Sequence, residues 1–277
     1  EMCIRDRTHN IGVVLPSDVY YGSGAYFQNC LLGVCEPASL LGYNVLITTS
    51  NVHDISELQS LVESNRVDGM LLTRALEDDR ALQYLSQVNF PTALTGTCRY
   101  DNIIQVDTDN EGAAEKMTTL LIGKGFRRFA FLVKNMSYNV DRKRHEGFCR
   151  ALIKNGISEK DQLFYNGSIR MEFLDAIIEN IISKKVECII CGDDEICTMV
   201  MSRLQAEGYR IPKDVAIASL YNSTNLDCYS PAVTAVSVAA SQMGGTAVRQ
   251  LIQRLRGENY EKKTMLDYDI LFRKSTN

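Results

Sequence analysis

Residues 186–208 read VECIICGDDEICTMVMSRLQAEG, and this stretch decides the fold class. Its first part is an apolar run that ends at a glycine, as in a buried strand. Its second part places apolar residues at helical spacing up to another glycine. A buried strand followed at once by a helix is the repeating unit of a parallel sheet covered by helices. The predicted fold class is therefore α/β.

The same alternation extends along the chain in both directions. Predicted strands occupy residues 10–18, 43–50, 67–73, 91–96, 103–109, 126–133, 161–167, 186–192, 215–221, 233–238 and 263–273. Predicted helices occupy residues 25–42, 54–65, 79–88, 110–125, 138–156, 170–184, 194–208 and 240–257. We expect Asp54 to cap one helix, and Pro37 to bend another without dividing it. We also expect Gly244 and Gly245 to allow close helix packing.

Two successive α/β halves of similar size predict two similar lobes, each a parallel sheet sandwiched by helices. We assign residues 9–107 and 238–261 to an N-terminal lobe and residues 108–237 and 262–277 to a C-terminal lobe. Residues 1–8 are expected to form a leader outside the fold, because charges precede any periodic pattern there. The carboxyl ends of the strands are expected to face one another across a crevice that holds a small molecule.

Composition limits the partners of the chain. A formal net charge of -4 gives no basis for binding nucleic acid through this segment, because phosphate recognition needs clustered Lys and Arg. The nine cysteines, odd in number and mostly inside apolar runs, favour a reducing compartment and thus the cytoplasm. No apolar stretch approaches the roughly 20 residues that cross a bilayer, so we expect no membrane partner.

The sequence contains no complete motif of the enzyme classes considered. A dinucleotide site needs a third glycine where the motif GSGAYF has Phe27, and no phosphate-binding P-loop motif occurs. Cys188 and Cys191 have a metal or redox spacing, but they lie within an apolar strand, so we interpret them as buried core residues. The three histidines belong to no catalytic or metal motif. We predict a binding protein without catalytic residues, metal or cofactor.

Polar and aromatic side chains gather where the predicted strands end. The candidate ligand-binding residues from this pattern are Asp18, Tyr20, Tyr21, Phe27, Tyr138, Asp193, Tyr221 and Asn222. Aromatic faces stack on flat rings while carboxylates and amides make directional hydrogen bonds, as a sugar or nucleobase requires. The alternative for each residue is a role in a turn or a helix cap. The charge run 142–144 suits solvated surface, with one or two side chains turned to the crevice.

Four segments together resemble the LacI/GalR family of transcriptional regulators. They are GFRRFAFL (125–132), RKRHEGFCRAL (142–152), GYRIPKDVAIASLYNS (208–223) and VTAVSV (233–238). Earlier landmarks extend the match over residues 10–276. The resemblance implies a fold of the periplasmic-binding-protein-like type I, serving as the effector-binding and dimerisation module of a cytoplasmic repressor or activator.

The resemblance also implies roles for single residues. Arg144 matches the arginine that reaches the effector, Asp193 and Asn222 match two polar positions of the ligand site, and Phe27 matches an aromatic that stacks on the ligand. Gly96 departs from the family because an aspartate often stands there. The family's helix-turn-helix and hinge helix are absent from these 277 residues, so operator DNA is expected to be contacted only through a missing N-terminal domain.

The leading hypothesis is therefore the effector-sensing and dimerisation domain of a LacI-type regulator. It would bind a small polar effector, a sugar or related metabolite, between its lobes and act as a homodimer. The alternative is an extracytoplasmic sugar-binding protein of a transporter, which shares the fold and would need an export signal.

Overall fold

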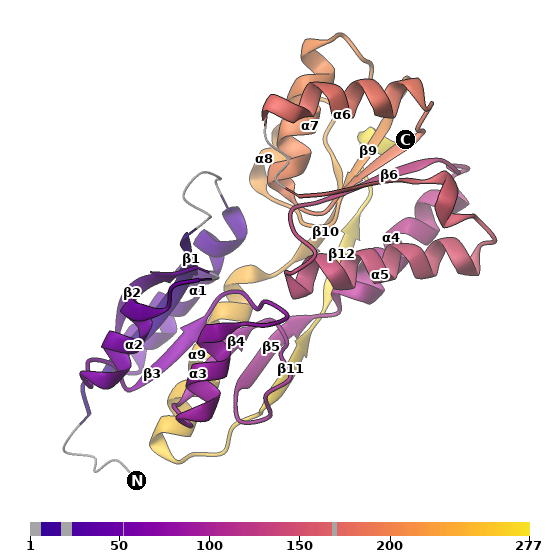
Figure 1. The fold of residues 1–277 in the computed structure, drawn as a ribbon. Helices are drawn as coiled ribbons and strands as arrows, with labels where there is room; N and C mark the ends of the chain where they lie inside the picture. Colours follow the sequence, from indigo (N-terminus) through magenta and orange to yellow (C-terminus); the bar gives the residue numbers. More distant parts are fainter. Residues whose placement is uncertain (1–6, 18–23, 52, 168–170) are drawn as a thin grey trace. The chain divides into compact units, whose positions relative to one another are not determined.

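The chain divides into two compact units, which the computed structural model describes over residues 7–17, 24–51, 53–167 and 171–277 (Figure 1). The first unit comprises Glu1–Thr108 and Ala239–Leu266, and the second comprises Asp109–Val238 and Asp267–Asn277. Both are built from a sheet dominated by parallel strands and flanked by helices. The predicted α/β class is confirmed.

The first unit contains a parallel sheet with the strand order β2-β1-β3-β4-β5-β11. Its strands are β1 (Asn10–Pro16), β2 (Asn44–Ser50), β3 (Gly69–Leu72), β4 (Thr92–Thr95), β5 (Ile104–Thr108) and β11 (Lys263–Leu266). Its helices are α1 (Ala25–Leu40), α2 (Ser56–Glu63), α3 (Arg80–Gln87) and α9 (Ala240–Arg256). The inner strands β3, β4 and β5 are buried along their whole length, because helices cover both faces of the sheet.

Successive residues of each inner strand enter different cores. Val13 and Leu71 pack in the core that contains residues of α1 and α9, whereas Val14 and Leu72 pack in the core that contains residues of α2 and α3. This alternation follows from the two-residue period of a strand. It leaves the carboxyl ends of the strands as the places where the unit can present polar groups.

Helices α1 and α9 cross in close contact at glycines. A Cβ atom on Gly244 would lie 2.2 Å from the backbone oxygen of Cys30, and one on Gly33 would lie 2.0 Å from that of Ser241. A Cβ on Gly245 would lie 3.1 Å from the backbone oxygen of Gly33. The close packing predicted for the glycine pair of α9 is confirmed.

The second unit repeats the arrangement with the strand order β7-β6-β8-β9-β10-β12. Its strands are β6 (Phe129–Val133), β7 (Leu163–Asn166), β8 (Cys188–Cys191), β9 (Ala216–Ser219), β10 (Thr234–Val238) and β12 (Tyr268–Leu271). Its helices are α4 (Asn110–Gly123), α5 (Asn139–Lys154), α6 (Met171–Ser183), α7 (Asp194–Ala206) and α8 (Thr224–Cys228). Short 3-10 turns cover Glu159–Asp161 and Lys274–Thr276. All its pairings are parallel except that of β10 with β12.

Both faces of this sheet are also buried. Phe131 belongs to the core formed with α4 and α5, and the next residue, Leu132, belongs to the core formed with α6 and α7. Cys188 and Cys191 are fully buried in β8, so their predicted role as core residues is confirmed. Burial raises the pKa of the Cys188 thiol, which keeps it protonated and unreactive.

Two predictions about single elements were wrong. The last predicted strand, 263–273, divides at Asp267: β11 pairs in parallel with β5, and β12 pairs antiparallel with β10. The pairing partner sets this break, and the alternation of residues along the chain does not encode it. The second error concerns α2, which begins at Ser56 with Ile55 at the cap position. Asp54 still accepts a hydrogen bond from the backbone N–H of Ser56 at 2.9 Å.

Candidate functional site

A network of charged side chains lies at the carboxyl ends of β6 and β8 in the second unit. Lys134 directly follows β6, and its Nζ lies 2.8 Å from Oδ2 of Asp193, which directly follows the β8 turn. The same ammonium contacts the carboxylate of Glu195. Burial opposes the charge of Lys134, but these two carboxylates outweigh it and raise the pKa of the lysine. We call the set Lys134, Asp141, Arg144 and Asp193 the β6–β8 network.

Asp141 is the buried acid of this network. Its carboxylate, only 4% exposed, accepts hydrogen bonds from the backbone N–H groups of Lys134 at 3.1 Å and Asn135 at 3.0 Å. Burial raises the pKa of Asp141 to about 6, although the Asn135 N–H, Arg144 and Lys134 pull it down, and the nearby charge of Asp193 raises it further. The network therefore contains an acid that titrates near neutrality.

Arg144 connects three elements. It projects from α5, is 7% exposed, and donates from Nη1 to the backbone oxygen of Gly192 at 2.6 Å and from Nε to Oδ1 of Asn110 at 3.1 Å. Gly192 precedes Asp193, so Arg144 and Asp193 meet at the same turn after β8. The guanidinium thus fixes this turn against α4 and α5, and it is not solvated surface.

Asp193 has two structural contacts besides any ligand role. It stands at the N-cap of α7, and its carboxylate accepts the backbone N–H of Ile196 at 2.9 Å. The capping alternative is therefore real for this residue. The ion pair with Lys134 uses its other carboxylate oxygen, Oδ2.

The remaining candidates of the second unit lie between β6 and α5 and after β9. Tyr138 stands at the cap position of α5 and is half-buried, and Tyr221, after β9, is 3% exposed. Asn222 is held elsewhere: its Oδ1 accepts a hydrogen bond from Nη1 of Arg273 at 2.8 Å, and the same arginine contacts Asp227. The contacts of Asn222 thus lead toward the C-terminal residues and not toward Arg144.

In the first unit, Phe27 lies in the first turn of α1 and is half-buried. Its ring meets Tyr26 edge-on, with 5.3 Å between centroids. Asp18, Tyr20 and Tyr21 lie outside the described residues.

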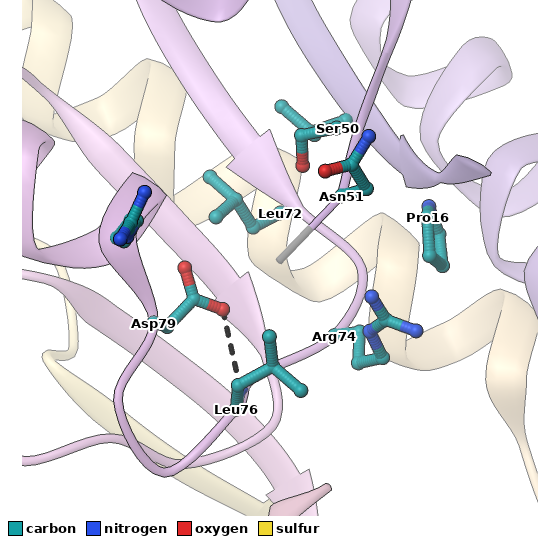
Figure 2. Close-up of a pocket in the computed structure, with 9 residues that line it drawn as sticks. Pro16, Ser50, Asn51, Leu72, Arg74, Leu76 and Asp79 are labelled. Carbon is teal, nitrogen blue, oxygen red and sulfur yellow. Dashed lines mark hydrogen bonds between the residues drawn. The ribbon is translucent and has the colours of Figure 1, made fainter. Parts of the chain in front are cut away.

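A pocket opens at the carboxyl ends of β1, β2 and β3 in the first unit (Figure 2). Its empty space is about 360 Å³, counted out to the solvent at its mouth. The apolar lining comes from Val14, Pro16, Leu72 and Leu76. The polar lining comes from Ser50, Asn51, Arg74, Asp79 and Arg80. We call it the β1–β3 pocket.

Sequence reasoning missed several of these residues. Lys134, Asp141 and Asn110 were not among the predicted candidates. Lys134 directly follows a predicted strand, so it could have been found by considering every charged residue at a strand end. Arg80 is the first residue of α3, where charged residues are common, so the sequence around it did not indicate a binding role.

Gly96, where the family often has aspartate, has φ +136°, a backbone conformation that favours glycine.

The described residues contain no group of three or more His, Cys, Asp or Glu side chains placed to hold a metal ion. Within the same residues, none of the helices combines the length and the apolar character needed to span a bilayer.

Comparisons with known proteins agree on one family. The family described as "Periplasmic binding protein-like domain" matches residues 118–276. Catabolite control protein A of Staphylococcus xylosus is 24% identical over 275 residues, covering 98% of this chain and 82% of that protein. A solved structure of the transcription regulator CcpA of Lactococcus lactis is 26% identical, with a TM-score of 0.84 and coverage of 98% of this chain and 100% of that one. A solved complex of the transcriptional regulator CelR with cellobiose is 24% identical, with a TM-score of 0.86 and coverage of 97% and 85%.

Proposed function

This chain belongs to the periplasmic binding protein-like domain family, as the effector-binding domain of a LacI/GalR-type transcription regulator, and we propose that it senses a sugar or a related small polar metabolite. The resemblance to LacI/GalR regulators found in the sequence is confirmed. Relatives that carry the names of regulators favour this function over an enzyme and over the transporter alternative.

The observation that carries the proposal is the β6–β8 network. Arg144 and Lys134 are held in place by Gly192, Asn110 and Asp193, so donors and acceptors at the strand ends have fixed directions. Fixed polar groups at strand ends are what a hydroxyl-rich ligand requires, because each hydroxyl needs a partner in a defined direction. The relative CelR was solved with cellobiose, which supports a sugar as the ligand class.

The ligand contacts that we propose are those predicted from the sequence. They are Tyr138, Arg144, Asp193, Tyr221 and Asn222 of the second unit, Phe27 of the first unit, and Asp18, Tyr20 and Tyr21, which lie outside the described residues. An effector switches a regulator only if it binds one conformation more tightly than the other. We propose a homodimer as the switching species and operator DNA as the partner of the full-length regulator.

We place the protein in the cytoplasm. The eight cysteines among the described residues are all free thiols, and four of them are buried. Free cysteines in this number are typical of proteins that work in a reducing compartment.

The test is a thermal-shift screen of the 277-residue protein against neutral sugars, acidic sugar derivatives, nucleosides and amino acids. A true effector raises the melting temperature, because it binds only the folded state. Arg144→Lys keeps the charge but loses the planar fork of donors, so the shift should shrink strongly. Asp214→Asn, in the exposed Arg210–Asp214 ion pair of the same unit, is the control and should leave the shift unchanged.

Two results would count against the proposal. A screen in which no compound of any class raises the melting temperature contradicts effector sensing. A sugar that binds Arg144→Lys and Asp193→Asn as tightly as it binds the wild type contradicts the assignment of the network to the ligand.

A further inference from the structure

Helix α5 carries a histidine and a cysteine that contact each other outside the β6–β8 network. His145 and Cys149 are four residues apart, so they lie on the same side of the helix, one turn from each other. The Sγ atom of Cys149 lies 3.6 Å from Nε2 of His145 and 3.9 Å from its Nδ1. Both side chains are half-buried, so small solutes can reach them. A cysteine sulfur and an imidazole nitrogen are the ligands that zinc and related metal ions prefer.

The distance between these two atoms matches that between two ligands of one metal ion. In a tetrahedral zinc site the metal lies about 2.3 Å from the sulfur and about 2.0 Å from the nitrogen, which places the two ligand atoms about 3.5 Å apart. Sγ of Cys149 and Nε2 of His145 are separated by 3.6 Å. A hydrogen bond from a thiol to an imidazole has a similar length, so the surroundings of the pair decide between the two interactions.

Two carboxylates give these surroundings a negative charge. Glu159 lies in the 3-10 turn that packs against α5, and Glu146 follows the histidine on the helix. Burial raises the pKa of the Cys149 thiol, and the charges of Glu159 and Glu146 raise it further. Burial lowers the pKa of His145, whereas the same two charges raise it. Both groups therefore lie in a negative potential, which attracts a cation.

The charge of Glu159 is the stronger attraction for a cation. Glu146 forms an ion pair with Arg142, with 3.8 Å between Oε1 and Nε, so part of its charge is already compensated. Glu159 forms no ion pair with any of the residues that the structure describes, and its carboxylate contacts the Cys149 thiol. A cation beside the thiol would therefore gain the attraction of this carboxylate.

Aromatic rings hold the imidazole in a fixed orientation. The ring of His145 lies against that of Phe164 in β7, with 4.3 Å between centroids, and it meets the ring of Phe131 in β6 edge-on at 5.8 Å. Phe131 is fully buried, so one side of the imidazole is packed against the core of the second unit. A ligand that is already held in place loses little side-chain freedom when it binds a metal ion.

From these contacts we propose that His145 and Cys149 bind Zn²⁺ or a similar thiophilic divalent metal ion. The thiol releases its proton to the solvent as the metal–sulfur bond forms, and the neutral imidazole donates a lone pair. Glu159 acts through its charge, because the described residues contain no group of three His, Cys, Asp or Glu side chains placed to hold a metal ion. Water fills the remaining positions, so the metal exchanges more readily than in a closed four-ligand site. The inference is independent of the proposed function.

The test is a titration of Zn²⁺ into the reduced 277-residue protein, followed by calorimetry in a buffer that does not bind metal ions. We expect one ion at this site and the release of about one proton, which the same titration in two buffers of different ionisation enthalpy measures. Co²⁺ is the spectroscopic probe, because a cobalt–thiolate bond gives a near-ultraviolet absorption band that hydrated Co²⁺ lacks.

The variants assign the site to its residues. Cys149→Ser removes the sulfur, and His145→Phe removes the ring nitrogens while it keeps an aromatic ring against Phe164. Each should abolish the cobalt–thiolate band of this site. Glu159→Gln should weaken Zn²⁺ binding about ten- to a hundredfold, the usual effect of removing a group beside the metal ligands. Cys228→Ser is the matched control, because Cys228 is an exposed thiol of the same unit, and it should leave the band and the affinity unchanged.

Three results would overturn the inference. The first is that Zn²⁺ does not bind, which would show that the His145–Cys149 contact is a hydrogen bond only. The second is that His145→Phe and Cys149→Ser bind Zn²⁺ as tightly as the wild type, and the third is that Cys228→Ser loses the binding. Circular dichroism checks the fold of each variant. If a ligand variant unfolds, the exposed Glu159→Gln carries the test, and an unchanged affinity in that variant contradicts the proposal.

Discussion

Each unit places its first strand second from one edge of the sheet, between the second and third strands along the chain. The first unit runs β2-β1-β3-β4-β5-β11 and the second runs β7-β6-β8-β9-β10-β12. The common order arises because strands joined through helices pair in parallel in both units. The units differ at the last strand, which is parallel in the first and antiparallel in the second. The two units thus share the order of their strands but differ in the direction of their last strand and in the residues at their strand ends.

The strand ends of the two units carry different side chains. In the second unit, Lys134 and Asp193 form an ion pair, and Arg144 donates hydrogen bonds to Asn110 and to the backbone oxygen of Gly192. In the first unit, the β1–β3 pocket collects two guanidiniums around a carboxylate that the backbone already uses. The second unit therefore holds its strand-end groups in fixed directions through contacts with one another and with the backbone.

The two units can be compared at the close helix crossing that each contains. Gly147 of α5 corresponds to Gly244 of α9, since a Cβ on Gly147 would lie 2.1 Å from the backbone oxygen of Glu111 in α4. Gly244→Ala and Gly147→Ala should each lower the free energy of unfolding by about 3 kcal/mol, the upper end of overpacking costs. Urea unfolding measures both.

Gly123→Ala serves as the control for this pair, because no atom lies within 4 Å of the added Cβ. It should be neutral or slightly stabilising. A Gly147→Ala protein as stable as the control would break the equivalence of the two units.

The second-largest effect concerns pH and belongs to the second unit alone. The folded-state pKa of Asp141 is raised from 3.8 to about 6 by burial, so the folded state holds this proton more tightly than the unfolded state does. The resulting stability is fully present below pH ~4 and is lost as pH rises through about 6, with a magnitude of about 3 kcal/mol.

Asp141→Asn should remove this contribution. The measurement is the free energy of unfolding of both proteins between pH 4 and pH 7, taken as a difference at each pH. Parallel curves for wild type and variant would show that Asp141 does not titrate in this range.

The smallest effect compares two helix caps. Asp79 accepts two backbone N–H groups of α3 and that of Leu76 before the helix. Asp193 accepts one at α7 and pairs with Lys134, which keeps Glu195 as a second partner. Asp79→Ala should therefore cost about 1.5 kcal/mol and Asp193→Ala about 1 kcal/mol. Thermal unfolding of both variants checks the order, and the reverse order would show that the ion pair outweighs the cap.

The regular elements could be predicted because their signals are local. Apolar runs such as 186–192 and helical periodicity such as 240–257 marked the strands and helices, and the burial of Cys188 followed from its apolar neighbours. The break at Asp267 could not be predicted, since β11 and β12 differ in their pairing partners and not in their own pattern.

The candidate site was predictable only in part. Arg144 was found from the family resemblance and Asp193 from both the strand-end pattern and the resemblance, and the structure brings them to one turn. The role of Asp141 was missed because its partners are backbone N–H groups of residues six and seven positions earlier. Arg80 was missed because its pocket is assembled from three strands that are separate in the sequence.

The sequence by itself determined the two α/β units, the family and the close helix crossing at Gly244. Each of these depends on residues that are near one another in the sequence: the hydrophobic periodicity, the family motifs and the glycine pair of α9. Only the tertiary structure decided which charged groups contact one another. Compensation depends on atoms within about 4 Å, where charges and hydrogen-bonding groups interact most strongly, and the folded backbone alone sets which residues reach that distance.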